Sequence, residues 1–365
     1  MPAVLDWRTV ADPHGVLEHA TRLLSAGQVV AFPTETTYTL AASGLAPAAV
    51  ERLADQRPLT LAVRSAAEAR DWIPGLSKLG QRLARRFWPG PLTLESSEGT
   101  AEGLVGRLDA AVRDRVCPGG ALRLRTPAHE ALLTVLARLP GPVLLAEAAG
   151  NGSGAVSAEQ VLSQANGHVD LLLDDGPSRF QQPATLVQVV GHSWSILQPG
   201  VITEQMLKQQ AGCQVVFVCT GNTCRSPLAE ALCKKRLADA LGCTIEELPE
   251  RGFLISSAGV AAYPGGPAAP EAVEVARTYG ADLDAHQSRP LSSQLAVGAD
   301  FLVAMTQGHL LTLMEMFPRL GSQPRLLSAE GTDLPDPIGM GPEVYEECGR
   351  QIWSHLGPLI EEIRK

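Results

Sequence analysis

The sequence predicts a two-domain α/β protein, in which an α/β domain precedes a second domain built on a doubly wound parallel sheet. A chain of 365 residues is long enough for two domains that each bury a core. The first half alternates short Val- and Leu-rich runs with amphipathic segments, separated by Gly and Pro. The second half opens with an apolar run, a tight polar loop and a helix-like segment, the order of a parallel α/β unit. We place the first domain at 1–205, a short linker at 206–213 and the second domain at 214–365.

The first domain begins with an amphipathic segment over 16–24, which predicts a helix, and an apolar run over 27–32, which predicts a strand. The strand ends in a polar cluster at 33–36. Short Val- and Leu-rich segments bounded by Gly and Pro follow at 87–94, 122–127, 143–146 and 196–200. This alternation favours a sheet covered by helices.

Composition argues against several classes of protein. No apolar run is long enough to span a membrane. Residues 1–10 carry Asp6 and Arg8 and lack a cleavable apolar stretch, so we expect a cytoplasmic protein. The net charge is −9, with 18 basic and 20 acidic residues up to position 213 and 12 basic and 19 acidic residues after it. Because neither half is basic, we do not expect tight binding to nucleic acid.

Cysteine usage indicates a reducing compartment. An odd number of cysteines at irregular spacing argues against a disulfide framework, and no paired C-x-x-C sets predict a zinc site. We therefore expect no metal. The seven cysteines are Cys117, Cys213, Cys219, Cys224, Cys233, Cys243 and Cys348.

The loop from Cys219 to Ser226 is the strongest functional signal. It lies between the apolar run 215–218 and the helix-like segment 227–232. Backbone N–H groups in such a loop form an anion nest, to which the helix N-terminus adds positive potential. Arg225 can bind two phosphate oxygens, and the same field favours a Cys219 thiolate as nucleophile. Ser226 can donate a hydrogen bond to that sulfur. The remaining predicted phosphate-binding residues are Thr220, Gly221, Asn222, Thr223 and Cys224.

A simpler interpretation is a buried cysteine at a strand end, with Arg225 pairing with surface carboxylates. The flanking elements and the Gly221-Asn222 turn favour the phosphate site instead. Cys224 has two interpretations that the sequence leaves open. It could form a reversible disulfide with Cys219, or pack beneath the loop as a small apolar residue.

Residues 215–365 resemble the low-molecular-weight protein tyrosine phosphatase family. Beyond the loop, the matching blocks are 257–259, 286–289, 299–306 and 333–337. In that family the Asp before Pro in the last block is the general acid, so the resemblance implies this role for Asp336. A carboxylic acid there could protonate a poor leaving group and then activate water, although a solvated Asp-Pro turn is the alternative. The implied mechanism passes through a cysteinyl phosphate and needs no metal, since an arginine and the nest supply positive charge.

The loop resembles most closely the bacterial protein arginine phosphatase branch of this family. Tyrosine-specific members carry a bulky aliphatic residue where this chain has Thr223, and aromatic residues after the acid-loop Asp-Pro, where it has 338–341. In the arginine branch the Thr favours phosphoarginine, and both Thr223 and Asp336 can bond a guanidinium. That branch has Phe where this chain has Ile338, so a general protein tyrosine phosphatase is the alternative.

Residues 15–202 resemble the YrdC-like threonylcarbamoyl-AMP synthase family through 31–36 and 87–93. That family binds ATP, threonine and bicarbonate in a basic cavity and makes an intermediate for tRNA modification. Two cations of the family pattern are replaced here, by Asp55 and Gln198, and two hydroxyls are lost, at Ala149 and Ala184. An acid in place of a lysine repels a polyphosphate. The cavity residues that remain are Thr34, Arg57, Arg125, Asn151 and Ser153.

We therefore expect a degenerate YrdC-like domain before a working cysteine-dependent phosphatase that acts on phosphorylated proteins. No cofactor is expected, except ATP and threonine if the first domain is active. An active synthase, with its link to tRNA, and a non-catalytic module that binds a nucleotide or a partner are the alternatives for that domain.

Overall fold

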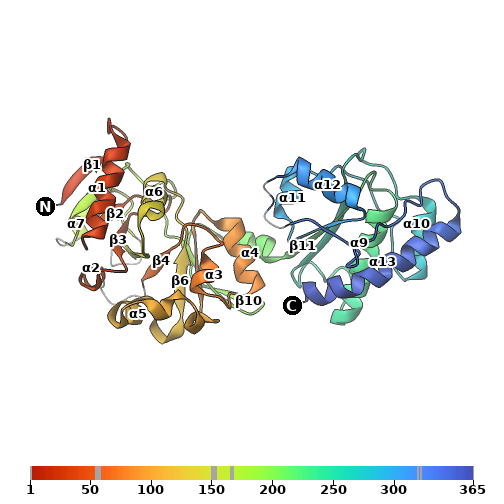
Figure 1. Ribbon diagram of the computed structural model, residues 1–365, viewed down its shortest axis with the longest axis horizontal. Helices are drawn as coiled ribbons and strands as arrows, with labels where there is room; N and C mark the ends of the chain where they lie inside the picture. The colour runs from red at the N-terminus through yellow and green to blue at the C-terminus, as the bar shows by residue number, and fades with distance from the viewer. Residues whose placement is uncertain are drawn as a thin grey trace. The chain divides into compact units, whose positions relative to one another are not determined.

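The computed structural model of the protein describes residues 2–53, 59–148, 154–164, 168–318, 320 and 323–364. The chain forms two compact units, Met1–Gln210 and Ala211–Lys365, which we describe separately (Figure 1). The residues predicted as a linker, 206–213, are taken up largely by the end of helix α8 (Glu204–Ala211) and the first residue of strand β11 (Cys213–Cys219).

The first unit is built on one mixed sheet in the strand order β1-β8-β2-β3-β7-β4-β6-β5-β9-β10. Its centre is antiparallel, because β3 pairs with both β2 and β7 in that sense. The strands are β1 (Ala3–Asp6), β2 (Val30–Phe32), β3 (Thr39–Ser43), β4 (Thr60–Ala62), β5 (Leu92–Ser96), β6 (Leu122–Arg125), β7 (Val143–Glu147), β8 (Leu171–Asp174), β9 (Thr185–Val190) and β10 (Ser193–Gln198).

Helices cover this sheet. The predicted amphipathic segment is helix α1, which buries Val16, Leu17, Ala20 and Leu24 at helical spacing. These side chains pack with α6 and with β2 in one apolar cluster. The helices are α1 (Pro13–Ser25), α2 (Pro47–Arg52), α3 (Ala69–Trp72), α4 (Lys78–Phe87), α5 (Ala110–Val116), α6 (Glu130–Arg138) and α7 (Ala158–Gln164).

The second unit is a doubly wound α/β fold, as predicted. Its four strands are all parallel, in the order β12-β11-β13-β14. Alternate residues of β11 face opposite cores, so Val215 and Phe217 join one apolar cluster while Val216 and Val218 join another. A parallel strand buried on both faces reads as a continuous apolar run, which is why this strand was predictable. The other strands are β12 (Phe253–Gly259), β13 (Phe301–Ala304) and β14 (Arg325–Leu326).

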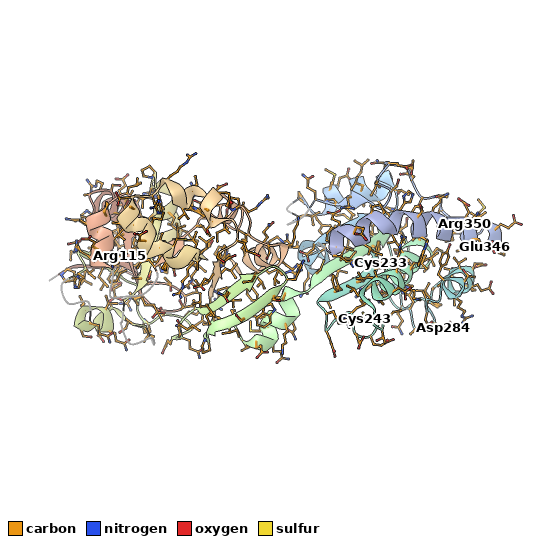
Figure 2. All side chains as sticks on the ribbon, turned by 90° about the horizontal axis from the view of Figure 1, so that it is seen from below. Arg115, Cys233, Cys243, Asp284, Glu346 and Arg350 are labelled. Atoms are coloured by element: carbon orange, nitrogen blue, oxygen red, sulfur yellow. The ribbon has the colours of Figure 1, made fainter. Side chains whose placement is uncertain are left out.

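The larger core of this unit lies between the sheet and helices α9, α10 and α13. Cys233 of α9 is fully buried in it (Figure 2). Helices α11 and α12 pack on the opposite face. The helices of the second unit are α9 (Arg225–Leu241), α10 (Pro270–Thr278), α11 (Ser293–Gly298), α12 (Gln307–Met316) and α13 (Pro342–Ile363).

Candidate active site

The predicted phosphate loop joins the carboxyl end of β11 to the N-terminus of α9. Strand β11 is paired with β12 on one side and with β13 on the other. The chain therefore winds away from β11 in both directions, and doubly wound folds bind ligands at such a switch point. The loop N–H groups and the first turn of α9 share this place.

Cys219 is almost fully buried, and its sulfur has two polar contacts. The Ser226 Oγ lies 3.0 Å from the Sγ atom, and the Asn222 backbone N–H donates to it at 3.3 Å. The Ser226 hydroxyl accepts from the Asn222 side-chain amide at 2.9 Å, and its proton can point to the Cys219 sulfur or to the Ala258 carbonyl, which is 3.4 Å away.

Asn222 holds the loop in shape. Its backbone is left-handed, with φ of 56°, a conformation that asparagine adopts more readily than other non-glycine residues. Its amide nitrogen donates to Ser226 and to the Ser257 hydroxyl at 2.8 Å, and its amide oxygen accepts from the Arg289 N–H at 2.9 Å. Its carbonyl accepts from His286 Nε2 at 2.8 Å. These contacts fix the conformation of the loop at Asn222.

Arg225 and Asp336 meet in the structure, as expected of residues that share a site. The buried Arg225 guanidinium donates from Nη2 to Asp336 Oδ2 at 2.5 Å and from Nη1 to the Leu334 carbonyl at 3.2 Å. Its Nε–H has no partner among the described residues, although it is buried. The Asp336 side chain is 47% exposed. An anion could thus satisfy the Nε–H, and the carboxylate is free to move outward.

The other predicted loop residues surround this pair. Gly221 and Thr223 are partly exposed, and the Thr223 carbonyl accepts from the Ala269 N–H at 2.9 Å. Cys224 is buried, with its sulfur 3.4 Å from the Tyr345 hydroxyl. Burial and then that contact raise the pKa of Tyr345, and burial raises the pKa of Cys348, on the same helix, to about 12. Cys224 is thus packed as a small buried residue in this structure.

Thr220 is joined to helix α12 by a histidine that the sequence analysis did not single out. His309 Nε2 lies 2.9 Å from the Thr220 hydroxyl, and Nδ1 lies 2.9 Å from the hydroxyl of Thr306. Burial and then the Arg225 charge lower the pKa of His309 below its ordinary value of 6.5, against the effect of two nearby carboxylates. The same helix end binds the acid loop, since the Gln307 N–H donates to Asp333 Oδ1 at 2.7 Å.

Residues 338–341, which directly follow the acid-loop motif, include no aromatic residue. Ile338 and Met340 occupy those positions, and both are mostly exposed. The loop after β12 does carry an aromatic residue, Tyr263, whose side chain is 88% exposed. Two residues before it, the Ala261 N–H donates to the carbonyl of Thr220, which brings this loop beside the phosphate loop. The sequence analysis missed Tyr263.

The first unit contains a cavity of about 380 Å³, and of the predicted cavity residues that the structure describes, Thr34 lines it and Arg125 does not. Thr34 and Glu35 line it. Arg125 contacts this lining, because its Nη2 donates to Glu35 at 2.8 Å and to the Thr36 hydroxyl at 2.8 Å. The second Glu35 oxygen accepts from the Ala128 N–H at 2.8 Å. The cation of Arg125 is therefore already neutralised. The predicted Arg57, Asn151 and Ser153, with Asp55 and Ala149, lie outside the described residues.

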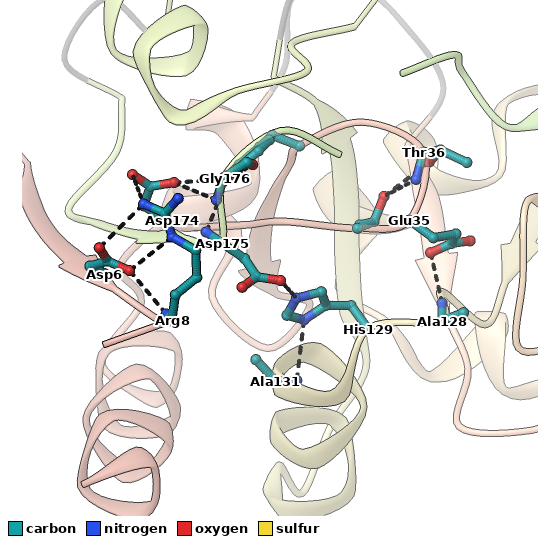
Figure 3. Close-up of polar contacts among 12 residues, drawn as sticks. Asp6, Arg8, Glu35, Thr36, Ala128, His129, Ala131, Asp174, Asp175 and Gly176 are labelled. Carbon is teal, nitrogen blue, oxygen red and sulfur yellow. Dashed lines mark hydrogen bonds and ion pairs between the residues drawn. The ribbon is translucent and has the colours of Figure 1, made fainter. Parts of the chain in front are cut away.

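His129 and Asp175 line the same cavity, and neither was predicted. The Ala131 N–H donates to His129 Nδ1 at 3.2 Å, so a neutral His129 carries its proton on Nε2, which lies 3.2 Å from Asp175 Oδ2 (Figure 3). The lining thus contains two acids, each with a basic partner.

Two other predictions concern absences. No group of three or more His, Cys, Asp and Glu that could hold a metal is found in the described part of the chain. Among the described helices, none is long and apolar enough to cross a membrane.

The second unit thus combines a doubly wound parallel sheet, a buried Cys219 at the end of β11 and an ion pair between Arg225 and Asp336. Residues 214–365 match the family described as low molecular weight phosphotyrosine protein phosphatase. The chain is 35% identical over 155 residues to the protein-arginine-phosphatase of Bacillus subtilis, a match that covers 41% of this chain and 97% of that protein. The chain belongs to the low-molecular-weight phosphatase family through this unit.

Residues 22–200 match the family of Sua5, YciO and YrdC, described as telomere recombination, and the first unit belongs to it. The chain is 28% identical over 202 residues to the threonylcarbamoyl-AMP synthase of Pyrococcus abyssi, covering 53% of this chain and 56% of that protein. It therefore spans about half the length of that relative. A solved structure of Pyrococcus abyssi Sua5 has 17% identity and a TM-score of 0.50, covering 96% of each chain, and shows the fold alone.

Proposed function

We propose that the second unit is a protein arginine phosphatase that works through a cysteinyl phosphate. The observation that carries this proposal is the Cys219 sulfur held by Ser226 and by a loop N–H, beside a buried Arg225 whose Nε–H has no partner in the described residues. A phosphoryl group in the nest would place its oxygens on the loop N–H groups and on the guanidinium. It would lie against the sulfur, in position for attack.

The reaction has two steps. The Cys219 sulfur forms a bond to phosphorus as the P–N bond of phosphoarginine breaks, and Asp336 gives its proton to the leaving guanidine nitrogen. Asp336 then takes a proton from water, whose oxygen attacks phosphorus and releases the thiolate and inorganic phosphate. In the structure the Asp336 carboxylate contacts Arg225, where substrate oxygens would bind. A bound phosphoryl group would therefore displace this carboxylate toward the leaving group.

Thr223 is the proposed selector of the leaving group. It is partly exposed in the phosphate loop, and among the described residues its hydroxyl makes only a long contact, 3.6 Å, with the Cys224 sulfur. A hydroxyl in this position can form a hydrogen bond with a planar guanidinium, whereas a phenyl ring offers it no hydrogen-bonding group. The Bacillus subtilis relative is named for arginine, which agrees with this assignment.

The experiment compares turnover of phosphoarginine and phosphotyrosine peptides by the purified full chain and by Thr223→Ile. We expect the wild type to prefer phosphoarginine, and the ratio of the two kcat/KM values to move at least about tenfold toward phosphotyrosine in the variant. Thr220→Val is a matched control, since it removes a neighbouring loop hydroxyl. A wild type that prefers phosphotyrosine would overturn the arginine assignment.

A tyrosine phosphatase is the second candidate, and Tyr263 is the observation that favours it. A phenyl ring of a phosphotyrosine substrate could stack on this exposed ring beside the loop. Under this alternative, Tyr263→Ala would raise KM for phosphotyrosine peptides. Under the arginine proposal, Thr223→Ile changes the ratio of the two kcat/KM values more than Tyr263→Ala does.

For the first unit we propose a ligand-binding domain without synthase activity. Two observations support this proposal. Arg125 is held by a buried carboxylate, and Gln198, where the family has an arginine, bonds Glu147 at 3.4 Å. We expect no threonine-dependent release of pyrophosphate from ATP by the full chain. A thermal shift with ATP or threonine, without turnover, would identify a retained ligand.

A further inference from the structure

Strand β12 forms one edge of the sheet in the second unit, and part of that edge is unpaired. The Cys213 N–H donates to the Gly252 carbonyl and the Val260 N–H donates to the Cys219 carbonyl, so even-numbered residues of β12 face β11. Odd-numbered residues therefore direct their N–H and C=O groups outward. Consistent with this, the Phe253 N–H donates outward to Leu248, and Gly259 exchanges outward bonds with residues 289 and 291.

Between these two points the edge is open. Within the described residues, the Ile255 N–H and C=O and the Phe253 C=O have no hydrogen-bond partner, whereas Ser257 is buried and its carbonyl accepts from Arg289 Nε at 2.8 Å. The unpaired groups alternate along one side of the strand at the spacing that a neighbouring strand would match. A residue placed antiparallel to Ile255 could exchange two hydrogen bonds with it.

A cavity of about 420 Å³ lies along this open edge. Its lining comes from both sides of the sheet, with Ile245 and Leu248 on one side and Leu254 and Leu295 on the other. It is mostly apolar, so it suits the alternating side chains of an extended segment. Its charged lining residues are Lys234 and Arg289. Lys234 also pairs with Glu230, whereas the Arg289 terminal amino groups contact no carboxylate in the described part of the chain.

We propose that the open edge of β12 docks an extended acidic segment of the phosphorylated protein substrate as an added strand. This inference rests on the proposed phosphatase function. The unpaired backbone groups call for an extended polypeptide, and the two cations call for acidic side chains on it. A second copy of this chain fits less well, because it would bring the same two cations to the joint.

The register relates this edge to the phosphate loop. Ile255 is opposite Val215, and Cys219 lies four residues further along β11. At about 3.3 Å per residue this is roughly 13 Å, so a docked segment would lie about four or more residues from the phosphorylated side chain. Residues 289–291, which follow the open edge, also reach the loop, since Arg289 N–H binds Asn222. Residues 289–291 therefore lie between the open edge and the phosphate loop and contact both.

Hydrogen exchange of single amides tests the proposal directly. The probe is a phosphoarginine peptide with an acidic segment of alternating apolar residues about five positions away, bound to the full chain carrying Cys219→Ser to prevent turnover. We expect the unpaired Ile255 amide to exchange at least about tenfold more slowly when the peptide saturates the protein. The ladder-bonded amides of Leu254 and Ser256 are internal controls. Unchanged exchange at Ile255 with the peptide bound would overturn the inference.

Kinetics provide a second readout. Lys234→Gln should raise KM for the acidic peptide about two- to fivefold and leave a small aryl phosphate unaffected. Lys235→Gln is the matched control, because Lys235 pairs with Asp239 and does not line the cavity. Equal effects of the two variants would contradict docking. If the Ile255 amide exchanges more slowly at higher protein concentration in the absence of peptide, the edge binds a second copy of this chain instead. Absence of any aryl phosphate turnover would contradict the phosphatase proposal itself, so the two failures are distinguishable.

Discussion

Arg225 and Arg125 are both buried arginines that contact a carboxylate, but their partners differ. The carboxylate beside Arg225 belongs to Asp336, which is 47% exposed, and the Arg225 Nε–H is left without a partner in the described residues. The carboxylate beside Arg125 belongs to Glu35, which is 7% exposed and is held by a second donor. Arg225 can exchange its partner for a phosphate at little cost, whereas Arg125 cannot, because a buried Glu35 would lose its counter-charge.

The comparison also concerns how each site is assembled. The phosphate loop takes its nucleophile, its N–H groups and its cation from eight consecutive residues, so one local shape preorganises all of them. The cavity of the first unit draws its lining from segments that are distant in the chain. When all groups of a site come from one short loop, a change in the loop affects all of them together. When the groups come from distant segments, single groups can be lost while the domain keeps its fold. The following predictions test this difference.

The largest expected effect is that of Cys219→Ser. A hydroxyl is a far poorer nucleophile than a thiolate at neutral pH, so kcat should fall by at least about 10³-fold. Thermal unfolding should change little, since the hydroxyl is smaller and keeps a polar partner in Ser226. The measurement is single-turnover hydrolysis with phosphopeptide and aryl phosphate. Activity near wild type on either substrate would remove Cys219 from the reaction.

Asp336→Asn should have a large effect that depends on the leaving group. We expect a loss of about 10²- to 10⁴-fold for phosphoarginine and much less for an activated aryl phosphate, because only the former needs a proton. Asn keeps the shape and can still contact the site. Equal losses on both substrates would mean that the side chain only positions the substrate.

How well each site could be predicted follows from the same contrast. The strand, loop and helix around Cys219 are contiguous, so a pattern of residues specified them. The contacts that fix Asn222 come from 35 and 67 residues away, at Ser257 and Arg289, and no local periodicity indicates them. The segments that contain Ser257 and Arg289 were identified by their resemblance to the family, but no role was predicted for either residue. His309 was missed because a lone histidine at a helix N-terminus carries no chemical signal in sequence.

The first unit shows the same limit more strongly. The sequence singles out Arg125 as a cation of a ligand cavity, while its partner Glu35 is 90 residues away and was not paired with it. The strand before Glu35 was predicted, because β2 is an apolar run with a polar end. Which charged side chains meet depends on the order of the strands in the sheet. The order of these ten strands cannot be predicted from the residues of any single segment.

Arg125→Met should therefore destabilise the first unit without altering phosphatase turnover. Leaving Glu35 buried and unpaired should cost about 3–5 kcal/mol of the free energy of unfolding. Urea unfolding followed by tryptophan fluorescence reports mainly on this unit, which contains Trp7, Trp72, Trp88 and Trp194, against Trp353 in the second. Arg125→Met with Glu35→Leu should recover much of the loss. A single variant within about 1 kcal/mol of wild type would show that the pair is not structural.

The smallest expected effect is the pH dependence that His309 adds to the second unit. Its pKa is lowered in the folded state, by burial and then by Arg225, so the unfolded chain binds a proton more readily. The stability from neutral His309 is therefore complete above about pH 6.5. It is lost as the pH falls from there through the lower folded pKa, with a slope of at most about 1.4 kcal/mol per pH unit. His309→Gln, which keeps an amide near Thr220, should lose less stability than wild type between pH 7 and 5. The measurement is urea unfolding of both proteins across this range, followed by near-UV circular dichroism of the second unit. If the free energies of unfolding of the two proteins change in parallel with pH, His309 has the same pKa in the folded and unfolded states. The contact with Thr220 would then stabilise charged and neutral imidazole equally.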